Sequence, residues 1–209
     1  IMGCDNSASA STKEGKGSGD KPNIVFVLGG PGCGKGTQCK KIIDKYGYVS
    51  FSTGDLLRKY VKDKQDGWQD LDNAMKEGKL ISSQTLMKVL KEYIVKSKNK
   101  KILVDGYPRN QENINEWEKQ MGDEANVKGA LYFEVSNEEM KKRILGRNEG
   151  RADDNEATIV KRLENFEKQT KPIVSYFEKK HILITINGMR NVDEIFADVC
   201  KNFEEKGLN

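Results

Sequence analysis

The sequence predicts an α/β fold: a doubly wound sheet of five parallel strands with helices on both faces. Three observations favour this fold. Five short apolar runs, rich in β-branched and aromatic residues, are separated by stretches with helical periodicity. Strands that alternate with helices pair in parallel, and the helices then cover both faces of the sheet. A glycine-rich loop follows the first apolar run at once and leads into a helical pattern.

The strands are predicted at 23–28, 48–52, 101–105, 130–135 and 182–186. The helices are predicted at 36–47, where Gly47 ends the first, and at 83–96, 110–121, 137–146, 156–180 and 192–206. Two polar stretches, 62–72 and 148–155, are expected to be insertions over the sheet rather than core elements. Residues 1–21 hold almost no large apolar groups, so we predict a mobile, disordered tail there and a single domain at 22–209.

The composition argues against several function classes. The 36 basic and 32 acidic residues are interspersed, and no basic run alternates with aromatic residues, so we expect no nucleic-acid partner. No apolar run approaches the ~18 residues of a membrane-spanning helix. The four cysteines form no C-x-x-C pair and His181 is the single histidine, which argues against a zinc site. Sparse, unpatterned thiols favour a reducing compartment, and we expect a cytoplasmic protein.

The loop GGPGCGKGTQC at 29–39 has the composition of a polyphosphate-binding turn. Because glycine lacks a Cβ, the backbone N–H groups of such a loop can point at phosphate oxygens, and the following helix adds the positive end of its dipole. Lys35 can reach the β- and γ-phosphates of a nucleotide. The general pattern places Ser or Thr directly after the lysine; here Gly36 intervenes, and Thr37 is the candidate magnesium ligand. The alternative is a glycine-rich turn with an incidental lysine.

Four motifs, in this order, resemble those of the nucleoside monophosphate kinases, the family of adenylate kinase and UMP-CMP kinase. They are GGPGCGKGTQC (29–39), STGDLLR (52–58), DGYPRN (105–110) and GRADDN (150–155). The likeness spans about 22–207 and includes the extra glycine after the lysine. It implies a P-loop enzyme, a monomer, that transfers a phosphoryl group reversibly from ATP with Mg²⁺ to a nucleoside monophosphate. It also implies a small acceptor-binding lobe at about 52–82 and a short lid at about 147–157.

The resemblance assigns the nucleotide contacts residue by residue. ATP is expected to contact Gly30, Gly32, Cys33, Gly34, Lys35, Gly36, Thr37, Arg147 and Arg190. The nucleoside monophosphate is expected to contact Thr53, Arg58, Leu80, Ile81, Gly106, Arg109, Asn113, Arg151 and Arg162. Asp105 ends a predicted strand, where a carboxylate faces the ligand crevice of a parallel sheet. The resemblance gives Asp105 a magnesium role through water.

Phosphoryl transfer needs cations around the moving group, and arginine's planar fork suits phosphate oxygens. The catalytic set implied by the resemblance is Lys35, Arg58, Arg109, Arg147, Arg151 and Arg162. Arg143 lies four residues before Arg147 on one helix face, although a solvated basic helix explains that pair equally well. The lid departs from the family. Short lids commonly read R-G-x-x-S-G-R, whereas RNEGR (147–151) is two residues tighter, so either both arginines still reach the phosphates or one has lost its role.

Two positions disagree on the acceptor base. Thr53 matches adenylate kinases, whereas UMP-CMP kinases usually carry alanine there. Asn113 matches UMP-CMP kinases, whose amide donates and accepts and so suits cytosine or uracil. The flanking runs PRNQENINEW (108–117) and TKPI (170–173) also resemble UMP-CMP kinase. The sequence therefore favours UMP or CMP as the acceptor and keeps AMP as the alternative.

The run MGCDNSAS that starts at Met2 matches an N-myristoylation pattern with Gly3 as the acceptor, provided that Met2 is the initiator despite Ile1. Cys4 could add a palmitoyl group, and a second chain matters because one acyl chain binds membranes only marginally. A membrane tether is expected only through this acylation. The alternative is a tail without lipid.

Two rival functions remain open. A GTPase would need a guanine-reading Asn-Lys-x-Asp stretch, which the sequence lacks. A catalytically degenerate nucleotide-binding module would not need Lys35, Arg58, Arg109 and Arg162 together, although the altered lid keeps this alternative open.

Overall fold

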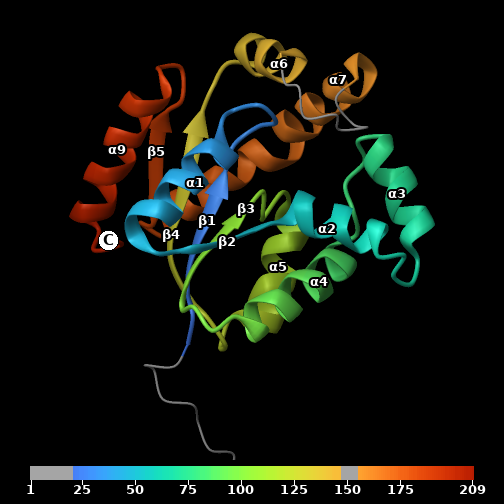
Figure 1. Cartoon of the computed structure of the whole chain (residues 1–209), viewed down its shortest axis with the longest axis horizontal. Coiled ribbons are helices and arrows are strands. Elements are labelled where there is room, and N and C mark those ends of the chain that lie inside the picture. Colours follow the sequence, from blue (N-terminus) through green and yellow to red (C-terminus); the bar gives the residue numbers. More distant parts are fainter. Residues whose placement is uncertain (1–20, 147–154) are drawn as a thin grey trace, which may run out of the picture.

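The computed structural model describes residues 21–146 and 155–209, and it confirms the predicted fold class (Figure 1). Five parallel strands form one sheet in the order β2-β3-β1-β4-β5. They are β1 Asn23–Leu28, β2 Val49–Ser52, β3 Lys101–Asp105, β4 Asn126–Glu134 and β5 Leu183–Asn187. Tail residues 1–20 and most of the predicted lid, 147–154, lie outside the described residues.

Nine α-helices occur in the described part of the chain. They are α1 Lys35–Tyr46, α2 Thr53–Lys62, α3 Trp68–Lys76, α4 Ser83–Lys96, α5 Gln111–Met121, α6 Asn137–Leu145, α7 Glu156–Asn165, α8 Val174–Lys179 and α9 Val192–Glu205. Side-chain caps start many of them: Ser82, Asn110 and Asn155 each accept from the N–H three residues on. Within the same residues no helix is long and apolar enough to cross a membrane.

The chain path places helices on both faces of the sheet. β1 to β2 and β3 to β4 cross the sheet in opposite directions, so right-handed crossovers put α1 and α5 on opposite faces. The ring of Phe26 on β1 contacts Trp117 of α5 and Phe177 of α8, whereas α9 packs against α1. The two helical layers bury the strands, and the interior residues of β1 and β3 have almost no exposed surface (Figure 1).

Two predicted elements are corrected. The helix predicted over 156–180 is interrupted: a π-helical segment, Phe166–Thr170, and a 3₁₀ turn, Lys171–Ile173, separate α7 from α8. Pro172 lacks the backbone N–H that a continuous α-helix needs at this position. The stretch 62–72 is not a mere insertion either, because α3 begins at Trp68 and Leu71 is buried in the core. Leu71 and Met75 lie one turn apart and give α3 an apolar side.

The α2–α3 lobe, which we define as residues 53–82, contacts α7 directly. The Thr158 hydroxyl donates to the carbonyl of Lys76 (3.0 Å), and the Asn165 amide donates to the carbonyl of Gly78 (2.9 Å). A Cβ at Gly78 would lie 3.0 Å from the Thr158 methyl group, so the two segments pack tightly. These contacts bring the chain after α3 beside α7, which carries Arg162.

Candidate active site

A cavity of about 860 Å³ opens at the carboxyl ends of the strands, between the glycine loop, the α2–α3 lobe and α7. Val27 of β1 pairs with Asp105 of β3, and Gly106 donates its N–H to the carbonyl of Val27 (3.0 Å). The loops after β1 and β3 therefore leave the sheet side by side, at the edge where parallel sheets bind ligands. Twelve of the predicted site residues line the cavity: Gly32, Gly34, Lys35, Gly36, Thr37, Arg58, Leu80, Ile81, Asp105, Gly106, Arg109 and Arg162.

The glycine loop is held from behind by α6. At Gly32, φ is +79°, and a Cβ there would lie 2.6 Å from the carbonyl oxygen of Met140. Gly30 and Cys33 are buried and are not among the cavity-lining residues. Gly34, with φ of +94°, precedes α1 and offers no side-chain cap. The N–H groups at the start of α1 therefore face the cavity with the positive end of the helix dipole, an arrangement that suits phosphate.

Lys35 folds back on the loop that carries it. Its Nζ donates to the carbonyl oxygens of Gly29 (2.7 Å) and Gly30 (2.9 Å) and lies 3.5 Å from the Sγ of Cys33. These neutral acceptors satisfy the ammonium group without neutralising its charge. A phosphate oxygen is a stronger, charged acceptor, so the side chain can exchange these contacts for a ligand.

The guanidinium and backbone of Arg109 are fixed from four directions. Its Nε donates to the carbonyl of Gly106 (2.7 Å), and its terminal nitrogen donates to the Thr53 hydroxyl (3.2 Å). Its backbone N–H donates to the Asn113 side chain (2.9 Å), and its carbonyl accepts from the Thr170 hydroxyl (2.7 Å). Arg109 is thereby aimed into the cavity before any ligand arrives. Arg58, on α2, also lines the cavity and pairs with Asp55 at 2.5 Å.

Neither residue predicted to read the base lies at the cavity surface. Thr53 is fully buried, and its hydroxyl bonds the carbonyls of Asp105 (3.2 Å) and Gly106 (3.1 Å). Asn113 is 2% exposed; its amide donates to Ser83 Oγ (2.8 Å), and its oxygen accepts from the backbone of Arg109. In this structure both side chains support Arg109, and the predicted base contacts stay predictions. Asn113 is the third residue of α5 and reaches back to the chain before the helix, as in a capping box.

The remaining cations divide into three groups. Arg162 of α7 and Arg143 of α6 both line the cavity, and the Nε of Arg143 donates to Glu139 (2.8 Å). Arg147 and Arg151 lie outside the described residues. Arg190 does not line the cavity; it is exposed and bonded to Asp198, and its predicted ATP contact stays a prediction.

Sequence reasoning missed part of the lining, most notably Arg143, Asn165 and Thr170. The signal for Arg143 was its helical spacing from Arg147, which a solvated helix explains equally well. Thr170 had no signal of its own, because its position depends on the π-helical segment that the sequence did not predict. These residues add one cation and two hydrogen-bonding groups to the cavity wall.

Thr37 and Asp105 both line the cavity, and both offer the oxygen ligands that Mg²⁺ prefers. Among the described residues, no three His, Cys, Asp or Glu side chains lie close enough to hold a metal ion together. These side chains alone therefore do not form a complete metal site. Mg²⁺ is usually held by one or two carboxylates together with substrate phosphates. The residues present therefore fit a magnesium ion that arrives with a nucleotide.

Cys39 also borders the cavity but does not supply a nucleophile. Burial raises the pKa of its thiol well above the usual value, and the nearby Asp105 charge raises it further. The thiol stays protonated at neutral pH, and a thiol is a poor nucleophile compared with a thiolate. The chemistry of this cavity is therefore that of positive charge and hydrogen-bond donors.

Comparisons with known proteins agree with this geometry. The family model described as adenylate kinase matches residues 27–182. UMP-CMP kinase 3 of Arabidopsis thaliana is 43% identical over 90% of this chain and 93% of the relative, and UMP-CMP kinase 1 of Oryza sativa subsp. japonica is 46% identical over 90% and 76%. Adenylate kinase isoenzyme 1 of Homo sapiens is 42% identical over 88% of this chain and 95% of the relative.

Proposed function

Because the chain belongs to the adenylate kinase family, it is a nucleoside monophosphate kinase, and we propose that it phosphorylates UMP or CMP with ATP. One observation carries the reaction type. Lys35, Arg109 and Arg162 come from distant parts of the sequence and line a single cavity. That cavity is large enough, at about 860 Å³, for more than one small ligand.

We assign the donor phosphates to the glycine loop. Lys35 leaves the Gly29 and Gly30 carbonyls and binds the β- and γ-phosphates, while the N–H groups at the start of α1 hold the same anion. Thr37 and Asp105 would hold Mg²⁺, directly and through water respectively. When bound, this ion supplies positive charge that offsets the charge on the phosphate oxygens.

We assign the acceptor phosphate to Arg58 and Arg109, with Arg162 and Arg143 beside the transferring group. Each guanidinium offers planar, paired donors for phosphate oxygens. The acceptor's own phosphate oxygen is the nucleophile and is already ionised near neutral pH, so no general base is required. The work of the protein is to place the two substrates in line and to exclude water as the α2–α3 lobe closes.

The choice of UMP or CMP rests on the runs at 108–117 and 170–173 and on the similarity to UMP-CMP kinases. The burial of Thr53 adds support, because a side chain withdrawn from the cavity no longer favours adenine. AMP is the second candidate, and the 42% identity to adenylate kinase isoenzyme 1 favours it. The burial of Asn113 likewise weakens the argument that its amide reads cytosine or uracil.

The deciding experiment measures ADP formation from ATP and Mg²⁺ with CMP, UMP, AMP or GMP in turn. We expect the highest kcat/KM with CMP or UMP. A higher kcat/KM with AMP would replace the pyrimidine proposal by adenylate kinase activity. Absence of turnover with all four acceptors would identify a degenerate nucleotide-binding module.

The structure also changes what Thr53→Ala is expected to do. The sequence predicts a selective loss of AMP use relative to CMP. Because the Thr53 hydroxyl accepts from the Arg109 guanidinium, we now expect kcat/KM to fall for every acceptor and the CMP-to-AMP ratio to stay constant. A selective loss of AMP use would restore the base-reading role of Thr53.

A further inference from the structure

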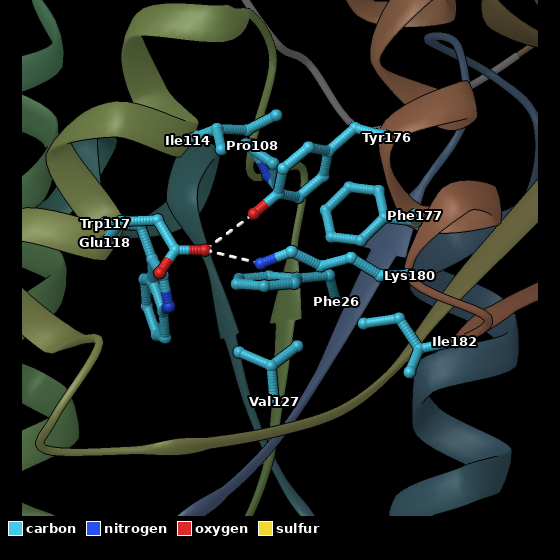
Figure 2. A pocket seen from close by; sticks show the side chains of 10 residues that line it. All are labelled: Phe26, Pro108, Ile114, Trp117, Glu118, Val127, Tyr176, Phe177, Lys180 and Ile182. Carbon is cyan, nitrogen blue, oxygen red and sulfur yellow. Dashed lines mark hydrogen bonds and ion pairs between the residues drawn. The ribbon is translucent and has the colours of Figure 1, made fainter.

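A second cavity, of about 260 Å³, lies between α5 and α8 over β1 (Figure 2). Its wall is mostly aromatic and aliphatic, and the residues that matter here are Phe26, Ile114, Trp117 and Phe177. Phe26, Trp117 and Phe177 are at most 4% exposed and pack edge to face or tilted against one another, so the wall is rigid. An apolar cavity of roughly 150 Å³ already accepts benzene, so this one has room for a substituted ring.

The rim of this cavity is polar and carries one carboxylate. Glu118 of α5 accepts from the Tyr176 hydroxyl (2.6 Å) and from the Lys180 ammonium (2.7 Å), both on the same oxygen (Figure 2). A carboxylate has about four acceptor positions, so the group has capacity for a further donor. The Lys180 and Tyr176 contacts lower the pKa of Glu118, which keeps it ionised at neutral pH.

Lys180 shows where a ligand cation would lie. Its Nζ is 2.7 Å from Glu118 and 4.6 Å from the centroid of the Tyr176 ring, a position that combines an ion pair with a cation–π contact. The side chain is nearly half exposed, so it can swing into water at little cost. Glu118 would keep Tyr176 as a partner and accept a new ammonium group in place of Lys180.

We propose that this cavity binds a small aromatic amine. The ring lies among Phe26, Trp117 and Phe177, and the ammonium group replaces that of Lys180 between Glu118 and the Tyr176 ring. An anionic ligand of the same shape would bring its charge to Glu118. The site therefore selects for positive charge as well as for a flat apolar body.

Pro108 connects this site to the candidate active site. It lines both cavities, and the next residue is Arg109. We expect that a ligand pressing on Pro108 strains the bonds that hold Arg109, and this would couple its binding to acceptor binding; this step rests on the proposed acceptor role of Arg109. Coupling of this kind is reciprocal, so each ligand changes the affinity of the other by the same factor.

The binding test uses the full chain with Trp68→Phe, which leaves Trp117 as the only tryptophan, and ¹⁵N-labelled indole. Phenethylamine is titrated, and the indole signal of Trp117 is followed by NMR. We expect a saturable shift with a Kd in the millimolar range, and at least about 5-fold weaker binding of phenylacetate. The absence of a saturable shift, or equal affinity for the two probes, overturns the proposal.

Two surface substitutions in this background are expected to act in opposite directions. Glu118→Gln removes the partner of the ammonium group and should weaken phenethylamine binding about 5-fold. Lys180→Met removes the competing ammonium group and should strengthen it about 3-fold. Glu118 and Lys180 are both exposed, so neither change threatens the fold. Unchanged affinity in both variants would show that the ring enters without the carboxylate, which contradicts the proposed site.

The coupling test repeats the phenethylamine titration with saturating CMP and measures the Kd for CMP with saturating phenethylamine. We expect the two constants to change by one common factor of about 2 or more. A Kd that CMP leaves unchanged overturns the link through Pro108. Failure of the kinase proposal is distinguishable, because phenethylamine binding without nucleotide does not depend on turnover.

Discussion

Gly32 and Gly36 show that glycines in one loop are required for different reasons. Gly32 has a positive φ, and a Cβ there would collide with the backbone of Met140. At Gly36 a Cβ meets nothing within 4 Å, and the residue lines the large cavity. The free protein thus requires Gly32 for its own fold, whereas the space beside Gly36 is available to a ligand.

We therefore predict a split between the two alanine variants. Gly32→Ala should lower the free energy of unfolding by about 2 kcal/mol or more, because it combines backbone strain with a clash. Gly36→Ala should unfold like the parent chain but raise the KM for ATP about 10-fold. Thermal unfolding and steady-state kinetics check both. A destabilised Gly36→Ala variant with normal KM would contradict this assignment.

Thr170 is a positioning residue for Arg109 rather than a substrate contact in this account. Its hydroxyl donates to the Arg109 carbonyl at 2.7 Å from a side chain that is 8% exposed. Thr170→Val keeps the shape but leaves that carbonyl without this bond, a loss of about 1 kcal/mol. We expect the KM for the nucleoside monophosphate to rise about 5-fold while the KM for ATP stays constant.

Two controls make the Thr170 prediction specific. Thr170→Ser restores the hydroxyl and should restore the acceptor KM. Ser175→Ala removes an exposed hydroxyl that bonds the carbonyl of Pro172 in the same region, and it should change neither KM. If Thr170→Val instead changed the ATP KM, or if Thr170→Ser failed to rescue, the positioning role would be refuted.

At the scale of elements, the contact between the α2–α3 lobe and α7 holds the lobe beside the cavity. It consists of the Thr158 and Asn165 side chains bonded to the carbonyls of Lys76 and Gly78. A movement of the lobe away from α7 would break these bonds, so we expect them to set how often the empty protein opens. Each bond is worth about 1 kcal/mol, which corresponds to a roughly 5-fold change in the open population.

Asn165→Ala should therefore speed hydrogen exchange of backbone amides in residues 68–81 about 5-fold without nucleotide present. The exposed neighbour Gln169→Ala is the matched control and should leave exchange there unchanged. Exchange is the readout because Asn165 also lines the cavity, so kinetics alone would mix two effects. Equal exchange rates in the two variants would contradict the proposed contact.

The sequence predicts the strands better than it predicts where a helix is interrupted. The central strands β1, β3 and β4 follow from apolar runs, because a strand buried on both faces needs no polar residues. The edge strands β2 and β5 are less buried and follow from short runs rich in β-branched and aromatic residues. The break between α7 and α8 was predictable only in part: Pro172 is a local signal against a continuous helix, but the π-helical segment Phe166–Thr170 that precedes it has no such signal in the sequence. The same limit hid Thr170, whose hydroxyl reaches Arg109 only because of that break.

The cationic residues of the site were predictable as a set, whereas the residues that hold them in position were not. Lys35, Arg58, Arg109 and Arg162 all reach the cavity lining. The motifs fix Lys35 and Arg109 just after β1 and β3, and they place Arg58 on α2 and Arg162 on α7. The roles of Thr53 and Asn113 could not be predicted, since a short polar side chain turns toward the nearest unpaired backbone group. That choice depends on the folded neighbourhood.

At the scale of the whole molecule, the amino-terminal motif makes a prediction that does not depend on the site. When translation starts at Met2 and an N-myristoyltransferase is present, the chain should gain one myristoyl mass at Gly3 and sediment in part with membranes. Gly3→Ala should abolish both, and Cys4→Ser should weaken membrane association alone, because two acyl chains anchor far better than one. An unmodified chain under these conditions would refute the acylation proposal.

The central claim is that separate segments of the chain converge on one phosphoryl group in transit between two nucleotides. The most direct test is a crystal structure with CMP, Mg²⁺ and a non-hydrolysable ATP analogue. We predict that Lys35 Nζ leaves the carbonyls of Gly29 and Gly30 and lies about 3 Å from β- or γ-phosphate oxygens, with Arg109 on the CMP phosphate. Phosphates bound elsewhere, with Lys35 still on those carbonyls, would contradict the account.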